Sequence, residues 1–156
     1  MPEDTLTDQL QQDLYKAMRA RDSVRVSVIR LLRSSIGYRE KETQKSLSDA
    51  DVLDVISGQV RQRRESIEMY EKGCRQDLVD KETAELIILQ EYLPSQLTDA
   101  ELCELVNRAI VDLGATGPRD KGRVMGLIMP NVRGKAEGGT VNLVVTKLLN
   151  ELEGQG

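Results

Sequence analysis

The sequence predicts an all-α protein, with a bundle of about four helices over residues 1–96, a hinge, and a small head of three helices over residues 97–156. Three observations predict this fold class. Apolar residues recur at spacings of three and four along nearly the whole chain, and no stretch alternates between apolar and polar residues over the length of a strand. Capping residues, glycines and prolines stand where the periodic stretches begin and end.

The first predicted helix covers about residues 7–21, and the second begins after Asp22 or Ser23. Either side chain can cap the second helix, because an Asp or Ser oxygen accepts a hydrogen bond from an N–H group of the first turn. The apolar residues from Val24 to Ile36 return every three or four positions, which is the spacing of one helix face.

The third and fourth predicted helices have recognisable ends. Ser48 and Asp51 resemble a capping box, with Asp in the place that Glu or Gln usually takes. Gly73 is expected to end the third helix, because glycine adopts the left-handed conformation of a C-cap at low cost. Pro94 is expected to stop the fourth helix. Residues 94–97 are the predicted linker.

The first helix of the predicted head begins at a capping box and ends at a glycine. In the box, the Thr98 hydroxyl and the Glu101 carboxylate are expected to accept hydrogen bonds from each other's backbone N–H groups. Gly114 follows the last apolar position of this helix, where a left-handed C-cap is expected.

The rest of the head is predicted to hold two helices separated by a glycine-rich loop. Pro118 suits the first turn of a helix, and Pro130 is expected to stop that helix. Residues 131–140 are then the predicted loop, and residues 141–152 are the predicted final amphipathic helix.

The composition excludes several kinds of catalytic site. The chain has no His, no Trp and no Phe, and its two cysteines are Cys74 and Cys103. Without imidazole there is no histidine base, no Ser-His or Cys-His pair and no histidine zinc site, and two thiols cannot form a four-thiolate metal site. Asp49, Asp51 and Asp54 carry the negative charge expected at a helix start. We therefore predict no catalytic residue, no metal ligand and no cofactor, and we interpret both cysteines as incidental.

Composition and hydropathy predict a cytoplasmic protein without a membrane segment. Two cysteines do not suggest a disulfide framework. The first thirteen residues are acidic and polar, unlike a signal or transit peptide. The longest apolar runs, such as Leu86–Leu89, have four residues, whereas a membrane span needs about 20.

Positive charge is concentrated in two stretches of a chain whose net charge is −4. Residues 15–39 hold seven cations and one acid, and residues 119–135 hold five cations and one acid. Arg30 and Arg33 fall opposite the apolar side of their predicted helix. These stretches have two interpretations: the solvated faces of ordinary helices, or a surface that contacts phosphates. The four tyrosines are interpreted as core residues and not as base-stacking residues: Tyr15, Tyr38, Tyr70 and Tyr92.

Some charged residues lie close enough to apolar faces to predict internal ion pairs. Glu82 and Glu85 share a helix face with apolar residues, and a buried carboxylate needs a cationic partner. Arg63, inside the apolar stripe of the third helix, is the predicted partner. Arg25 and Arg39 also lie near an apolar stripe and are candidates for internal pairing.

The glycine-rich segment of the head is the most unusual stretch. Gly122 and Gly126 leave a strip without side chains on one helix face. Each glycine costs roughly 1 kcal/mol relative to Ala inside a helix, so we expect either another helix or an extended backbone such as RNA to pack there. Gly134 lies in the predicted loop between Arg133 and Lys135. The segment lacks the Gly-Lys-Ser/Thr of a P-loop.

Several motifs resemble the YqeY family. They are Arg21-Asp22 before an apolar run to Ser35, Arg63-Arg64-Glu65-Ser66-Ile67-Glu68, Tyr92-Leu93-Pro94, Met125-Gly126 and Gly134-Lys135-Ala136. The family resembles the tail domain of the B subunit of the glutamyl/aspartyl-tRNA amidotransferase, which amidates mischarged tRNA. Related domains are appended to some glutaminyl-tRNA synthetases. The resemblance implies a helical body, a hinge, and a small head that touches tRNA.

The resemblance also implies which residues face RNA and what the chain does. The expected RNA-facing residues of the head are Lys121, Gly122, Arg123, Gly126, Arg133, Gly134 and Lys135. From the first basic stretch, and not from the resemblance, Arg30 and Arg33 are expected to extend this surface. We expect a noncatalytic tRNA-binding module that acts alone or with an aminoacyl-tRNA synthetase or amidotransferase subunit. One alternative is a protein-interaction adaptor. Another is an amidotransferase component, a carbon–nitrogen ligase with glutamine as amido-N-donor, an activity that would be inherited from the fused enzyme.

Overall fold

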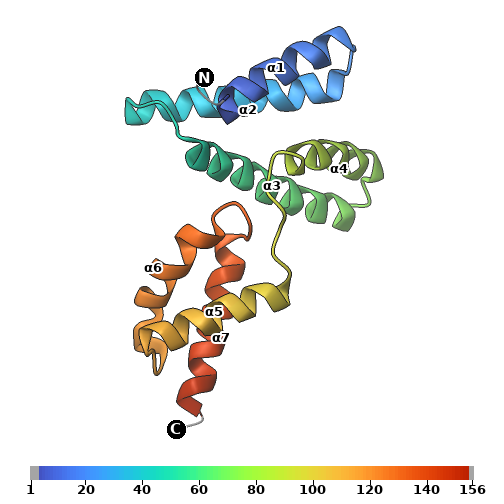
Figure 1. Ribbon diagram of the computed structural model, residues 1–156. Coiled ribbons are helices and arrows are strands. Elements are labelled where there is room, and N and C mark those ends of the chain that lie inside the picture. The colour runs from blue at the N-terminus through green and yellow to red at the C-terminus, as the bar shows by residue number, and fades with distance from the viewer. Residues whose placement is uncertain (1–3, 155–156) are drawn as a thin grey trace. The chain divides into compact units, whose positions relative to one another are not determined.

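A computed structural model describes residues 4–154. Within that range the chain forms helices and no β-strand (Figure 1). The all-α prediction is confirmed. The chain divides between Leu93 and Pro94 into an N-terminal unit and a C-terminal unit, each of them compact. The predicted domain ranges also include residues 1–3 and 155–156, which lie outside the described part.

The N-terminal unit is a bundle whose core receives large apolar side chains from all four of its helices. The helices are α1 (Leu6–Arg19), α2 (Ser23–Thr43), α3 (Asp49–Lys72) and α4 (Gln76–Gln90). Leu10, Leu32, Ile56 and Leu89, one from each helix, are completely buried. This arrangement follows from the apolar spacing of each helix, which places one stripe toward the core.

Two helix starts in this unit confirm the predicted caps. A carboxylate oxygen of Asp22 accepts a hydrogen bond from the backbone N–H of Arg25, with a distance of 3.1 Å. Ser48 and Asp51 exchange both hydrogen bonds of a capping box, each over 3.2 Å. Caps depend on contacts within one turn of the chain, which is why local sequence predicts them.

Gly73 is the C-cap of α3, as predicted, but the left-handed conformation expected there is wrong by one residue. Gly73 has a φ of −85°, and the left-handed conformation belongs to Cys74, whose φ is 56°. The N–H of Gly73 still donates to the carbonyl of Met69 over 3.0 Å. The helical hydrogen bonding therefore extends through the glycine, and the chain reverses one residue later than its composition suggests.

The C-terminal unit has an entirely apolar core. Its helices are α5 (Asp99–Leu113), the 3₁₀ turn η1 (Pro118–Asp120), α6 (Lys121–Val132) and α7 (Gly138–Gly154). Val106, Val124, Val145 and Leu149 are among its completely buried side chains. Gly114 has a φ of 64°, which confirms the predicted left-handed cap of α5.

The start of α5 contains part of the predicted capping box. The Thr98 hydroxyl accepts a hydrogen bond from the Glu101 N–H over 3.1 Å. Pro118 begins the 3₁₀ turn η1 and not the helix itself. Its fixed φ suits this turn as well as a first helical turn.

Two predictions about the second half of this unit are wrong. Pro130 does not stop its helix but lies inside α6, which continues to Val132. Proline in a last turn removes one hydrogen bond without preventing two further helical residues. The predicted loop over residues 131–140 is shorter, because α7 already begins at Gly138. The completely buried Val141 holds this first turn against the core, which outweighs the low helix propensity of the glycines.

Candidate nucleic-acid interface

The turn between α6 and α7 presents two of the predicted cations. Gly134 is buried and has a φ of 80°, a conformation that favours glycine. The N–H of Lys135 donates to the carbonyl of Val132 over 2.8 Å and closes the turn. Arg133 and Lys135 are both exposed. The buried glycine thus sets the backbone that carries a cation on each side of it.

Residues from the predicted linker hold this turn in place. The Gln96 side-chain amide donates to the carbonyl of Gly134 over 2.8 Å. The backbone N–H of Leu97 donates to the carbonyl of Lys135 over 2.9 Å. Sequence reasoning missed Gln96 as a residue that positions the site. The only signal was its place beside the apolar Leu97 in a segment otherwise interpreted as a connection.

The glycine strip of α6 is open. Gly122 and Gly126 are exposed, and a Cβ atom added at either position would meet nothing within 4 Å. Within the C-terminal unit, therefore, no other helix packs against the strip. Pro130 and Arg133 continue the same side of the helix, because spacings of three and four return to one face. The strip is a length of helix backbone without long side chains that ends at an arginine.

Arg123 has an internal role that the sequence did not reveal. Its guanidinium donates to the carbonyl of Leu113 over 3.0 Å and lies 3.2 Å from a carboxylate oxygen of Asp120. Asp120 also accepts a hydrogen bond from the N–H of Thr116, which is the main reason that the pKa of Asp120 is lowered. Arg123 therefore ties the end of α5 to the start of α6. Lys121, the first residue of α6, is half-buried.

The remaining predicted site residues belong to the other unit. Arg30 and Arg33 are exposed on α2. The structure thus gathers the seven predicted head residues on α6 and its following turn, inside one unit. The two arginines of α2 lie on the surface of the N-terminal unit.

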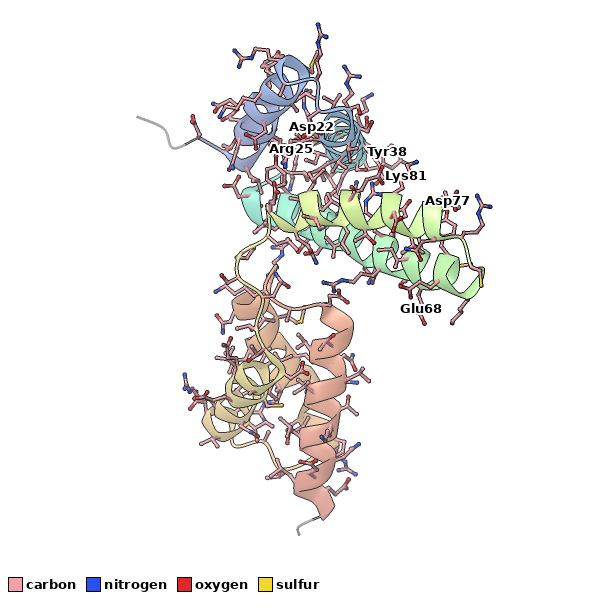
Figure 2. The ribbon with its side chains drawn as sticks, turned by 90° about the vertical axis from the view of Figure 1, so that its right-hand side faces the viewer. Asp22, Arg25, Tyr38, Glu68, Asp77 and Lys81 are labelled. Atoms are coloured by element: carbon pink, nitrogen blue, oxygen red, sulfur yellow. The ribbon has the colours of Figure 1, made fainter. Side chains whose placement is uncertain are left out.

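Internal ion pairs form where two predictions placed them. Arg63 Nη1 lies 2.9 Å from Glu82 Oε2 and also contacts the Glu85 carboxylate. Arg25 Nη1 lies 2.7 Å from Glu91 Oε2, and Arg25 also lies beside Asp22 (Figure 2). The hydrogen bond from Arg25 lowers the pKa of Glu91.

The prediction that all four tyrosines pack in the core is wrong for two of them. Tyr15, on α1, is 53 % exposed. Tyr38 is 67 % exposed, on the surface of α2 (Figure 2). Tyr38 lies two positions after the buried Ile36, which turns it to the opposite side of the helix. Tyr92 is half-buried, and its hydroxyl donates to Asp13 over 2.6 Å.

The described residues contain no group that resembles a metal site. Within residues 4–154, no three His, Cys, Asp or Glu side chains are placed to hold an ion. Asp49 accepts a hydrogen bond from the N–H of Leu6 over 3.0 Å, and Asp51 belongs to the capping box of α3. In the same part of the chain, no helix has the length and apolar character to cross a membrane.

Comparison with known proteins identifies the family. Residues 7–149 match the YqeY family, described as Yqey-like protein. The chain belongs to the YqeY family. This confirms the resemblance that the motifs suggested.

Three curated relatives of this YqeY-family chain are fungal, and each is named Altered inheritance of mitochondria protein 41, mitochondrial. The protein of Pyrenophora tritici-repentis is 33 % identical over 138 residues, which cover 86 % of this chain and 75 % of the relative. The protein of Lachancea thermotolerans is 37 % identical over 113 residues, covering 70 % and 60 %. The protein of Eremothecium gossypii is 41 % identical over 101 residues, covering 64 % and 55 %. The chain thus spans between about half and three quarters of the length of these relatives.

These names contradict the predicted cytoplasmic location. All three relatives are named as mitochondrial proteins. The prediction depended partly on a low cysteine content, which is typical of reducing compartments in general and cannot select the cytoplasm among them. The names state a compartment and no substrate.

Proposed function

We propose that this YqeY-family chain is a noncatalytic tRNA-binding module whose C-terminal unit contacts folded RNA. The observation that carries the proposal is the open glycine strip of α6, which runs from Gly122 through Gly126 and ends at the cations Arg133 and Lys135. A strip without side chains costs helix stability. A partner backbone that approaches the helix closely would compensate for this cost.

The chemistry of the strip suits the RNA backbone. Arg and Lys side chains contact phosphate oxygens and release counterions. Pro130 has no N–H, so it cannot donate the usual helical hydrogen bond to the carbonyl of Gly126. With no side chain at Gly126, this carbonyl is available to a ribose 2′-hydroxyl, which is the group that distinguishes RNA from DNA.

The acidic remainder of the chain shapes what the site would bind. A net charge of −4 opposes general attraction to nucleic acid. Binding would therefore depend on a folded RNA that fits the strip and the turn together. We further propose that an aminoacyl-tRNA synthetase or an amidotransferase subunit carries out the catalytic reaction on the tRNA, and that this chain contacts the RNA.

The direct test is tRNA binding by the double variant Arg133→Ala/Lys135→Ala. Affinity for bulk tRNA is expected to fall, and the slope of log K against log salt is expected to drop by up to about two phosphate contacts. Arg123 is left unchanged, because its removal would also break the contacts to Leu113 and Asp120.

The matched control is Arg108→Ala/Lys147→Ala, which removes the same charge from exposed positions on α5 and α7 of the same unit. It should bind tRNA with nearly the salt slope of the unmodified chain. The proposal is wrong if no tRNA binds at about 50 mM salt, where phosphate contacts are strong. Equal losses in both double variants would also contradict it.

A protein-interaction adaptor is the second candidate, because large apolar side chains are exposed on the same unit. Val111 on α5 is 77 % exposed and Leu143 on α7 is 73 % exposed. A protein partner that stays bound after nuclease treatment, and is lost in Val111→Ser or Leu143→Ser, would favour the adaptor. Conversion of Glu-tRNA to Gln-tRNA by the purified chain with glutamine and ATP would overturn the noncatalytic assignment.

A further inference from the structure

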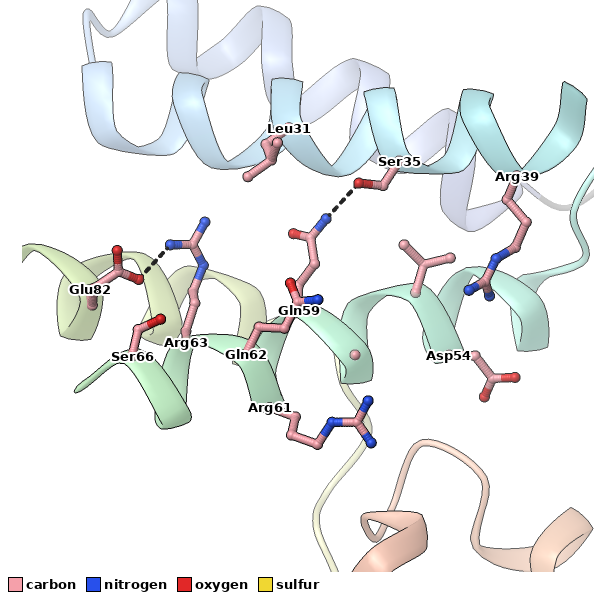
Figure 3. Close-up of a pocket in the computed structure, with 12 residues that line it drawn as sticks. Leu31, Ser35, Arg39, Asp54, Gln59, Arg61, Gln62, Arg63, Ser66 and Glu82 are labelled. Atoms are coloured by element: carbon pink, nitrogen blue, oxygen red, sulfur yellow. Dashed lines mark hydrogen bonds and ion pairs between the residues drawn. The ribbon is translucent and has the colours of Figure 1, made fainter. Parts of the chain in front are cut away.

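The N-terminal unit contains a groove between α2 and α3 that the proposed function does not use. Its volume is about 450 Å³ (Figure 3), within the range of roughly 300–1,000 Å³ typical of small-molecule sites. Leu31, Ser35 and Arg39 line it from α2, Gly58 and Gln59 line it from α3, and Glu82 lines it from α4. All residues that line the groove belong to this unit.

Two buried polar atoms at the groove have no hydrogen-bond partner within residues 4–154. Gln59 is only 9 % exposed; its amide nitrogen donates to the Ser35 hydroxyl over 3.0 Å, while its Oε1 is unpartnered (Figure 3). Arg63 Nη1 contacts the carboxylates of Glu82 and Glu85, whereas Arg63 Nε has no hydrogen-bond partner. Buried polar groups normally find partners. One acceptor and one donor without partners thus belong to residues that line the same groove.

The walls of the groove are also uncovered. A Cβ atom added at Gly58 would meet nothing within 4 Å, so the packing of this chain does not require a glycine there. Leu31 is 51 % exposed at the groove, although it is a large apolar residue. Arg39 reaches from α2 toward α3 beside the groove (Figure 3). Open space and an apolar wall therefore lie in the same groove as the two unpartnered atoms, and the Arg39 cation lies at the opposite end of that groove from Arg63 (Figure 3).

We propose that this groove binds one unpaired nucleotide, either free or looped out of an RNA. The edge of a base carries both a hydrogen-bond donor and an acceptor, which are the kinds of group that Gln59 Oε1 and Arg63 Nε lack. Unpaired bases are recognised on such edges while their faces pack against apolar or planar side chains, here Leu31. Arg39 then meets the phosphate. A simple amide would satisfy the first two atoms and leave the cation without a partner.

This site is separate from the head and goes beyond the proposed function. It lies on α2, α3 and α4 and uses none of the α6 residues. Binding of a free nucleotide to the groove does not depend on whether the head binds tRNA, and either proposal can therefore fail alone.

The experiment titrates the full chain with AMP, GMP, CMP and UMP, followed by calorimetry and by NMR. Ribose 5-phosphate is the probe for phosphate alone. Gly58→Leu fills the groove and is expected to raise the Kd for the nucleotide that binds best at least tenfold. Gly37→Leu is the matched control, because Gly37 is another helical glycine with open space beside it and does not line the groove. The control should keep the original Kd.

A second variant keeps the test valid if Gly58→Leu does not fold. Arg39→Ala changes an exposed side chain. It should weaken the binding of nucleotides more than the binding of the corresponding nucleosides. Reduced tRNA affinity in Gly58→Leu would identify an RNA base as the source of the ligand. Unchanged tRNA affinity with weakened nucleotide binding would identify a free nucleotide.

Three outcomes would overturn the inference. One is the absence of binding by all four nucleotides at millimolar concentration, which would mean that ordered water alone fills the groove. Another is ribose 5-phosphate binding as tightly as any nucleotide. The third is an equal effect of Gly58→Leu and Gly37→Leu. Arg133→Ala/Lys135→Ala should leave nucleotide binding unchanged, which separates this result from the test of the head.

Discussion

The two units of this chain place their polar groups in opposite ways. The N-terminal unit buries Glu85 and Gln59, and it surrounds Arg63 so that the side chain is 11 % exposed. Among the described residues, the C-terminal unit buries no charged or amide side chain, and its core is apolar throughout. Its cations Arg133 and Lys135 lie outside, on a turn held by backbone contacts. Charge is thus buried in the core of the first unit, whereas in the second unit it lies at the surface.

The two units can be observed separately because of their composition. All four tyrosines lie before residue 93, and the chain has no Trp and no Phe. Tyrosine fluorescence and near-UV circular dichroism therefore report the N-terminal unit alone, whereas far-UV circular dichroism reports the helices of both units. A variant that affects only one unit can be recognised in the full chain.

The largest effect is expected from Arg63→Met, which would break the buried charge cluster of the N-terminal unit. The side chains of Glu82 and Glu85 are 18 % and 12 % exposed, and both would lose their cation. Removal of one partner of a buried ion pair costs about 3–5 kcal/mol. Urea unfolding followed by tyrosine fluorescence should show this loss.

The control for this variant is Arg61→Met, an exposed arginine of the same helix, for which we expect a change within about 0.5 kcal/mol. The part of the far-UV signal that belongs to the C-terminal unit should unfold at its original urea concentration in both variants. A loss below about 1 kcal/mol for Arg63→Met would mean that the pair does not stabilise the unit, as is known for some buried pairs.

The features that the sequence predicted are those that depend on neighbours along the chain or on helix periodicity. The Asp22 and Ser48 caps involve one helical turn, and the Arg63 cluster follows from an arginine inside an apolar stripe that faces two carboxylates. The fold class followed from the same periodicity, whereas the family followed from the resemblance of several motifs and is shown by the family match. The tRNA-facing role of the head residues is still a prediction.

The features that the sequence did not predict depend on contacts between distant residues. Gln96 reaches Gly134 across 38 positions of the chain, and the buried Val141 decides that α7 begins earlier than its glycines suggest. The groove at Gln59 could not be predicted at all, because an unpartnered atom is defined only after every other contact is known. Periodicity indicates which face is buried but not which polar atoms find partners there.

A smaller effect, with a defined pH dependence, is expected from Tyr92→Phe in the N-terminal unit. Burial and the hydrogen bond to Asp13 raise the pKa of the Tyr92 hydroxyl above its ordinary value of 10.0. Because the folded pKa is the higher one, this stabilisation is complete below pH 10 and is lost as the pH rises beyond it. At neutral pH the free energy of unfolding of the variant should be lower than that of the unmodified chain by about 1–2 kcal/mol. Between neutral and alkaline pH, this free energy should fall less in the variant than in the unmodified chain.

Urea unfolding by far-UV circular dichroism from neutral to alkaline pH measures both parts of this prediction. Tyr38→Phe is the control, because Tyr38 is 67 % exposed and its loss should leave the free energy of unfolding and the pH profile unchanged. If the free energy of unfolding falls equally at alkaline pH in Tyr92→Phe and in the unmodified chain, ionisation of Tyr92 does not cause that fall.

The smallest change in stability is expected from Gly126→Ala, and it is a gain. Alanine is favoured over glycine inside a helix by about 1 kcal/mol, and the added methyl group meets nothing within 4 Å. The C-terminal unit should therefore become more stable while its tRNA affinity falls, since the methyl group keeps an RNA backbone away from the helix. Far-UV unfolding and a tRNA titration on the same preparation measure the two effects.

Gly37→Ala makes the same change in the N-terminal unit, where the added methyl group also meets nothing within 4 Å. It should give a similar gain in stability with no change in tRNA affinity. Both glycines are helical, and an added methyl group meets nothing within 4 Å at either one. A loss of tRNA affinity in Gly126→Ala alone would therefore mean that the RNA contacts the α6 strip. Equal affinities would mean that the α6 strip is an ordinary solvated face and that the head does not use it to bind RNA.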